Sequence, residues 1–259
     1  MLEPVDYNVQ QYSAYAQGRA LTPEGRAGWM GAFARHVTPN RPLAVLDLGS
    51  GTGRFTPALA DAFGGPVYGV EPADAMRAVA LDSARHPQVT YLAGAAEAIP
   101  LPDTSVDVVL MYLSFHHVRD KPAAVQEIAR VLRPGAGAQV LIRSTFSDRM
   151  PNFVWHRFFP RARTVEQEMF LPVGDVEQLF AAAGMRRMAL DAVPYRLAPN
   201  LADYTRRMQL RTISVFEYLT EDEITEGFEA MEAAAAADTE MKPLDELSDL
   251  LVLSGPTPS

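Results

Sequence analysis

The sequence contains no cysteine, no long apolar run and no excess of positive charge, and each absence excludes a class of protein. Without cysteine the chain forms no disulfide, no thiol nucleophile and no cysteine-ligated metal site. No apolar stretch approaches the about 20 residues of a membrane-spanning helix, and the first residues do not resemble a signal peptide. The formal net charge of −9 disfavours non-specific nucleic-acid binding. We therefore expect a soluble, cytoplasmic protein with neither nucleic-acid nor membrane partners.

Short apolar runs alternate with segments of helical spacing in the first part of the chain, which has 259 residues and 48% hydrophobic residues. The runs are apolar on both faces, which is typical of parallel strands covered by helices. We expect strands at residues 43–49, 67–70, 89–94, 106–113 and 138–143, with helices between them. Beyond Arg143 the segment that follows is aromatic, arginine-rich and interrupted by three prolines.

This change of pattern predicts one α/β domain with a helical cap formed by two insertions. The expected segments are N-terminal helices at 1–40, a ligand-binding core at 41–146, a cap insertion at 147–174, a core helix and strand at 175–197, a helical cap at 198–247, and a last strand and tail at 248–259. Residues 200–238 have helical spacing throughout.

A glycine-rich loop follows the first expected strand in the segment VLDLGSGTGRF, residues 45–55. Dinucleotide-binding loops have the pattern G-x-G-x-x-G, and here Arg54 stands where the last glycine is required, which argues against NAD. The residues that follow the last glycine, Arg54 and Phe55, replace the lysine and hydroxyl residue of a P-loop. Glu71 ends the second expected strand, where an acid can bind a ribose diol. The loop therefore fits a nucleoside that needs no phosphate site.

With three further segments, this loop resembles the class I S-adenosylmethionine-dependent methyltransferases that act on small molecules. The segments are VYGVEPADAM, LAGAAEAIPLPDTSVDVVLMYLSFHHVRD and VQEIARVLRPGA. The resemblance implies a Rossmann-like, seven-stranded, mostly parallel sheet with helices on both faces, a helical cap or lid, and S-adenosylmethionine as cofactor. The residues that it implies for cofactor binding are Tyr15, Arg19, Asp47, Gly49, Ser50, Gly51, Glu71, Pro72, Ala73, Met76, Ala95, Ala96, Glu97, Tyr112 and Leu113.

Two positions depart from the family's pattern. Ala95 stands where many relatives carry an acid that binds the adenine amino group. Arg143 and Ser144 follow the fifth strand, where some relatives carry an acid.

Adjacent histidines, His116 and His117, follow the fourth expected strand at its carboxyl end, where an acceptor would meet the methyl group. Histidine titrates near neutral pH, so either residue is a candidate general base. Because neighbouring loop residues seldom point the same way, we expect at most one to face the acceptor, with His116 slightly favoured. No third ligand accompanies the pair, so we expect no metal site.

Candidate acceptor contacts come from the N-terminal segment, the fifth strand and the cap: Tyr12, Arg143, Trp155 and Phe159. The cap's aromatic residues can form its core, line a pocket for a flat molecule, or both. Between Arg143 and Arg211 there are eleven arginines, no lysine and seven acids. These arginines either form ion pairs with the acids or bind an anionic acceptor, with Arg143 the best placed for the second role.

The sequence thus favours methyl transfer to a small organic molecule, and it leaves open whether oxygen, nitrogen or carbon is methylated. The acceptor would be a flat or aromatic, anionic natural product of secondary metabolism, and the enzyme a monomer or homodimer. A methyltransferase-like protein without methyl transfer, such as a cyclase or a partner subunit, is the alternative, and an NAD-dependent oxidoreductase is a weaker one.

Overall fold

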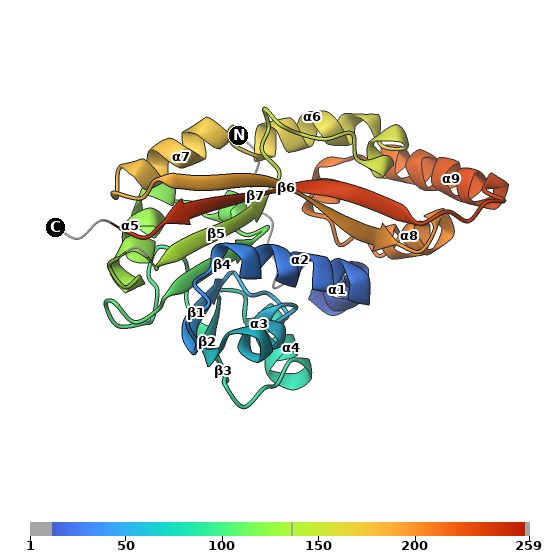
Figure 1. Ribbon diagram of the computed structural model, residues 1–259. Helices are drawn as coiled ribbons and strands as arrows, with labels where there is room; N and C mark the ends of the chain where they lie inside the picture. The colour runs from blue at the N-terminus through green and yellow to red at the C-terminus, as the bar shows by residue number, and fades with distance from the viewer. Residues whose placement is uncertain (1–11, 136, 257–259) are drawn as a thin grey trace.

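The computed structural model describes residues 12–135 and 137–256, which form a seven-stranded sheet flanked by helices (Figure 1). The strand order is β3-β2-β1-β4-β5-β7-β6, and β7 alone runs antiparallel to its neighbours. The predicted Rossmann-like, mostly parallel sheet is therefore confirmed. The strands are β1 Leu43–Leu48, β2 Gly64–Glu71, β3 Val89–Ala93, β4 Val108–Tyr112, β5 Gln139–Ser144, β6 Arg187–Ala198 and β7 Leu244–Ser254.

Helices cover both faces of the sheet, as predicted, each burying apolar side chains against it. The helices α5 and α7 pack on one face, while α2 and α3 pack on the other. The α-helices are α1 Tyr12–Gly18, α2 Pro23–His36, α3 Thr56–Phe63, α4 Asp74–Ser83, α5 Lys121–Val131, α6 Pro160–Met169, α7 Val173–Ala181, α8 Leu201–Met208 and α9 Glu221–Ala237, with 3₁₀ turns η1 Phe115–His117, η2 Val154–Arg157 and η3 Ser214–Tyr218. No helix in the described part of the chain is both long and apolar enough to cross a membrane.

The cap has an apolar core of its own, formed by α6, α8, α9, η2 and η3. The helical spacing of residues 200–238 does not produce one helix, because α8 ends at Met208 and α9 begins anew at Glu221. Thr220 starts α9 with a capping box, in which its hydroxyl oxygen accepts from the Glu223 N–H and the Glu223 carboxylate accepts from the Thr220 N–H.

The last strand is longer than the sequence predicted, since β7 begins at Leu244 rather than at residue 248. Its extra residues pair with the end of β6, and Tyr195 lies opposite Glu246. Ser144, the last residue of β5, pairs only with Asp249 of β7. The strands β6 and β7 therefore continue past the end of β5 toward α8 and α9, as Figure 1 shows, and form a wall at the edge where the parallel strands end.

Candidate functional site

The glycine-rich loop after β1 is fixed to the end of β2. The backbone N–H groups of Gly49 and Ser50 donate to the Val70 carbonyl at 2.8 and 3.2 Å. Gly49 has φ +75°, and a Cβ atom there would lie 2.4 Å from the Cβ of Ser114, so only glycine fits. Gly51 also has positive φ, but a Cβ atom there would meet nothing nearer than the Cε of Met76 at 3.5 Å. The loop is therefore open at Gly51, where a ligand can approach the backbone.

Glu71 holds this open loop in place from the end of β2. Its Oε2 accepts from the Gly51 N–H and its Oε1 from the Ala73 N–H, both at 2.9 Å. Burial raises the pKa of the Glu71 carboxyl, and these two N–H donors oppose that shift. A carboxylate offers about four lone-pair sites, so two remain for the ribose hydroxyls that the sequence assigns to this residue.

Asp47 is a buried acid beneath the same loop, 3% exposed, and it accepts a hydrogen bond of 2.7 Å from the Thr56 hydroxyl. Burial raises the pKa of its carboxyl to about 6, against the hydrogen bond and the charge of Arg54. The ionised carboxylate is therefore costly in the folded protein without ligand.

The variant Asp47→Asn should remove this cost and reveal it as a difference in pH dependence. Because the folded pKa is about 6 and the ordinary value 3.8, the wild type loses stability relative to the variant as pH rises from 3.8 to 6. The loss should level off above pH 6 at about 3 kcal/mol, from 1.36 kcal/mol per pKa unit. Urea unfolding of both proteins across this pH range measures the difference. Parallel stability curves would contradict the assignment.

The other predicted cofactor residues lie around the loop with differing exposure. Ala73, Met76 and Ala96 are buried, and Pro72 is exposed. The Ser50 hydroxyl is buried and has no hydrogen-bond partner among the described residues. The Ala95 side chain has no acceptor for the adenine amino group. One carboxylate oxygen of Glu97 accepts from the backbone N–H groups of Arg119 and Asp120, just before α5.

Glu97 thus also has a structural role at the start of α5. The opening at Gly51, the buried acid Glu71 and the unpartnered Ser50 hydroxyl together fit a nucleoside cofactor with a free ribose diol. The donor and acceptor chemistry of S-adenosylmethionine matches this set, with the adenine contact left to backbone groups near Ala95 and Ala96.

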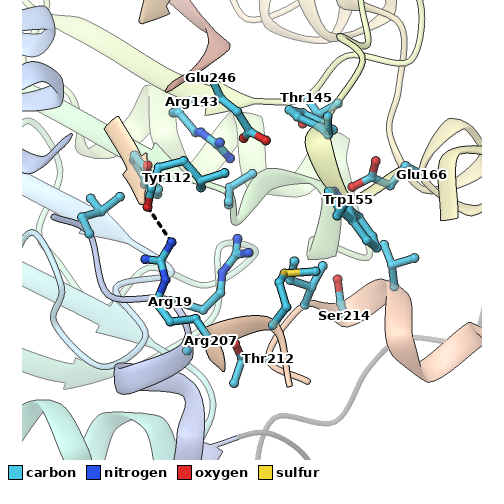
Figure 2. A pocket seen from close by; sticks show the side chains of 18 of the residues that line it. Arg19, Tyr112, Arg143, Thr145, Trp155, Glu166, Arg207, Thr212, Ser214 and Glu246 are labelled. Atoms are coloured by element: carbon cyan, nitrogen blue, oxygen red, sulfur yellow. Dashed lines mark hydrogen bonds between the residues drawn. The ribbon is translucent and has the colours of Figure 1, made fainter. Parts of the chain in front are cut away.

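A pocket opens beside this loop, between the ends of the strands, the N-terminal segment and the cap (Figure 2). It encloses about 1000 Å³ of empty space, part of which is open to solvent. The residues that line it include both predicted histidines and several charged and aromatic side chains: Tyr15, Arg19, Arg54, Tyr112, Leu113, His116, His117, Arg143, Trp155, Glu166, Phe170, Tyr195, Tyr204, Arg207 and Glu246.

Alternation along the strands explains why polar groups gather here. Leu110 of β4, Leu141 of β5, Val193 of β6 and Leu250 of β7 face the α2 side of the sheet and form part of its apolar core. Side chains two or four residues along a strand lie on the same face. These positions are Tyr112, Arg143, Tyr195 and Glu246, at the edge where the parallel strands end. The apolar face of the sheet therefore becomes polar at the pocket.

Arg143 is a deeply buried charge of the pocket, 6% exposed. Its guanidinium carbon lies 5.0 Å from the ring centre of Tyr112 and 5.6 Å from that of Trp29. Its Nη2 lies 3.5 Å from the Tyr195 hydroxyl, and its Nε has no hydrogen-bond partner among the described residues. Within the same residues no carboxylate forms an ion pair with it. Arg143 thus presents to the pocket a buried cation that has no ion-pair contact with the described carboxylates, and Figure 2 shows Glu246 beside it.

Two further arginines tie the N-terminal segment to the pocket's rim. Arg54 donates to the Arg19 carbonyl at 2.7 Å, and its guanidinium lies 4.6 Å from the ring centre of Tyr112. Arg207 of α8 donates to the Ala20 carbonyl at 2.6 Å. Burial lowers the pKa of both Arg54 and Arg207 from the ordinary arginine value, and both stay cationic at neutral pH.

Both predicted histidines lie in the η1 turn and line the pocket, so the expectation that at most one would face it is wrong. Their ring centres are 3.8 Å apart, because the tight turn lets one imidazole fold against the other. His116 also contacts Phe170, at 4.5 Å between ring centres. Burial and neighbouring cations lower the pKa of His117 to about 4 and that of His116 well below 6.5.

Of the remaining acceptor candidates, Trp155 lines the pocket, whereas Phe159 does not. Phe159 is 1% exposed and packs against Gly227 and Phe216 in the cap core, which corrects its predicted contact. Tyr12 begins α1, but its side chain lies outside the described part. The cap's aromatic residues thus serve both of the expected purposes, core and pocket wall.

Sequence reasoning missed several pocket residues: Glu166, Tyr195, Tyr204, Arg207 and Glu246. Alternation in the segments MALDAVPYRL and LDELSDLL could have placed Tyr195 and Glu246 on the core-facing side of their strands. Glu166 lies on α6 and pairs with His156 at 2.7 Å. No local sequence pattern predicts this pairing.

The arginines of the segment 143–211 divide between the two expected roles. Six of them form ion pairs with acids, so the simpler interpretation is right for these: Arg149, Arg161, Arg187, Arg196, Arg206 and Arg211. Arg143 and Arg207 instead line the pocket. The described residues contain no cluster of three potential metal ligands.

Comparison with known proteins bears on the family and the fold of the chain. Residues 46–138 match the family described as methyltransferase domain. An uncharacterized methyltransferase of Mycobacterium bovis is 40% identical over 137 residues, 53% of this chain and 51% of that protein. The chain thus matches about half the length of such curated relatives.

Two solved structures share the fold. A putative methyltransferase from an antibiotic biosynthesis pathway of Anabaena variabilis aligns with a TM-score of 0.69 and 24% identity, over 89% of this chain and 99% of that one. The [4+2]-cyclase SpnF aligns with a TM-score of 0.65 and 15% identity, over 100% and 99%. With the strand order, the glycine loop and Glu71, these findings support a class I S-adenosylmethionine-dependent methyltransferase, whose methyltransferase domain is matched over residues 46–138.

Proposed function

We propose that the protein transfers the methyl group of S-adenosylmethionine to a small, flat, anionic molecule bound in the pocket between sheet and cap. The observation that carries this proposal is the position of the pocket. Arg54 and Tyr112, which border the cofactor loop, also line the space that contains Arg143 and Trp155. A molecule in that space would lie next to the methionine end of the cofactor.

The chain's own contribution is mainly placement. The cofactor, when bound, supplies an electrophilic methyl group. The pocket walls hold the acceptor in line with it and exclude water, which lowers the entropic part of the barrier. Trp155, Phe153 and Phe170 offer a flat apolar wall, and Arg143 offers a charge to a carboxylate or phosphate. The named pathway of the Anabaena variabilis protein favours a natural product as acceptor.

Calorimetry with S-adenosylhomocysteine, followed by methyl-transfer assays with paired acids and amides, tests the proposal. We expect binding of the nucleoside and release of S-adenosylhomocysteine from S-adenosylmethionine only with an acidic acceptor. Binding without release, for acceptors that bind, would favour the alternative of a cyclase or partner subunit on the same fold. Absence of nucleoside binding would refute the proposal itself.

A histidine base makes a separate prediction. His117 is uncharged at neutral pH, because burial and the charges of Lys121 and Arg19 lower its pKa to about 4. If it takes the acceptor's proton, kcat should stay level from pH 6 to 8 and fall only as pH approaches 4. The variant His117→Gln should then lose about 100-fold or more in kcat. Rates of wild type and variant over this pH range decide, and a His117→Gln variant with the kcat of the wild type would exclude His117 as the base.

A further inference from the structure

The pocket holds a second polar group that faces Arg143, namely Glu246 of β7 (Figure 2). Its Oε2 accepts a hydrogen bond of 3.0 Å from the Tyr195 hydroxyl. Its Oε1 is buried and has no hydrogen-bond partner among the described residues. A buried carboxylate oxygen without a donor is costly, so a ligand that brings a donor to this atom would be favoured.

The partners of Glu246 fix its position. Tyr195 lies directly opposite it in the β6–β7 pairing, and the same hydroxyl lies 3.5 Å from Nη2 of Arg143. Tyr195 therefore connects the acid and the cation while leaving the Oε1 of Glu246 and the Nε of Arg143 unbonded. Burial raises the pKa of the Glu246 carboxyl, whereas the Tyr195 hydrogen bond, the charge of Arg143 and the Val154 backbone N–H oppose that shift.

The charges around the pocket indicate what kind of molecule fits between these groups. Four arginines and two glutamates line it. Glu166 is engaged by His156 at 2.7 Å, and both lining imidazoles are uncharged because burial lowers their pKa. An excess of positive charge therefore remains, and S-adenosylmethionine adds a sulfonium. An acceptor that neutralises Arg143 must also satisfy the carboxylate opposite it.

We propose that the acceptor carries a hydroxyl or amino group near its anionic group, and that Glu246 binds this hydrogen-bond donor while Arg143 binds the anion. This inference rests on the proposed function and narrows it to hydroxy or amino acids. Tyr195 is a positioning residue, since it holds the carboxylate of Glu246 rather than the acceptor. Simple acids without a donor would leave the Oε1 of Glu246 unsatisfied and would suffer repulsion from its charge.

Calorimetry on the protein saturated with S-adenosylhomocysteine tests this with three probes: benzoate, 3-hydroxybenzoate and 4-hydroxybenzoate. We expect at least one hydroxy acid to bind about tenfold or more tightly than benzoate, the effect of one hydrogen bond to a charged group. In Glu246→Met this advantage should disappear, while benzoate binds as well as in the wild type or more tightly. Structural damage alone would weaken all three probes together.

Two further variants guard against misfolding and non-specific charge effects. Glu246→Gln keeps the shape of the side chain and removes its charge. In this variant benzoate should bind more tightly than in the wild type, and the hydroxybenzoates should exceed benzoate in affinity by a smaller factor. Asp245→Asn makes the same charge change one residue away, on a side chain that is 59% exposed, and should alter neither affinity.

The outcomes separate this inference from the proposed function. Equal affinities of the three acids in the wild type would overturn it, as would a hydroxyl advantage that survives Glu246→Met or failure of every acid to bind. Failure of the protein to bind S-adenosylhomocysteine would instead refute the proposed function.

Discussion

Glu71→Ala is expected to weaken the binding of S-adenosylhomocysteine by about 100-fold or more. The carboxylate has two functions that the substitution removes together. It holds the loop at Gly51 through a 2.9 Å hydrogen bond, and it offers its remaining lone pairs to the ribose hydroxyls. Hydrogen bonds to a charged group contribute about 1.5–3 kcal/mol each, and 3 kcal/mol corresponds to roughly a 150-fold change in affinity.

Calorimetry on folded protein measures this effect, and two variants calibrate it. Glu71→Gln keeps one acceptor oxygen and should lie between wild type and Glu71→Ala. Asp74→Asn changes a nearby acid that is 84% exposed and bonded to Arg77, and should bind like the wild type. If Glu71→Ala binds the nucleoside with wild-type affinity, the cofactor does not lie against this loop.

The cofactor half of the site could be predicted because its signals are local. A buried strand, three glycines at alternate positions and an acid after the next strand all fall within a short segment. Gly49 illustrates the physical reason: its positive φ and the contact with Ser114 admit no side chain, so the sequence must show glycine there. The strand pattern predicted most of the sheet for the same reason, since each parallel strand is apolar on both faces.

The acceptor half could not be predicted in this way, because its residues meet through distant pairings. Glu246 reaches the pocket because β7 begins earlier than its apolar run suggests and pairs with the end of β6. Arg207 depends on where α8 ends within a longer helical pattern. Phe159 and Trp155 are both aromatic and lie four residues apart, yet of the two only Trp155 lines the pocket. Such a distinction depends on packing rather than on local sequence.

Arg143 was the exception, since it could be assigned from its place at the carboxyl end of a strand. The structure strengthens this assignment through the absence, within the described residues, of any carboxylate in ion-pair contact with its guanidinium. Six other arginines of the same segment, by contrast, each form an ion pair with a carboxylate. Burying an arginine without an ion-pair contact costs free energy, so the position of Arg143 at the pocket favours an anionic ligand.

Arg143→Met should therefore change stability and binding in opposite directions. Methionine can fill the space between Trp29 and Tyr112 without the cost of burying a charge. We expect this gain to exceed the lost attraction between Arg143 and Glu246, which are not in ion-pair contact, so the free energy of unfolding should rise by about 1 kcal/mol or more. The affinity for benzoate in the presence of S-adenosylhomocysteine should fall about 100-fold, because a bidentate arginine–carboxylate contact is lost. Nucleoside binding should not change, since Glu71 and the glycine loop remain intact.

Arg149→Met is the matched control for this test. Arg149 is 41% exposed and forms a surface ion pair with Asp249, so its loss should cost at most about 1 kcal/mol of stability and leave benzoate binding unaltered. Urea unfolding and calorimetry on the three proteins measure both quantities. A less stable Arg143→Met protein with wild-type benzoate affinity would show that Arg143 serves the fold through its contacts with Trp29 and Tyr112. The predicted combination, greater stability with lost anion binding, is one that a purely structural role for this arginine cannot produce.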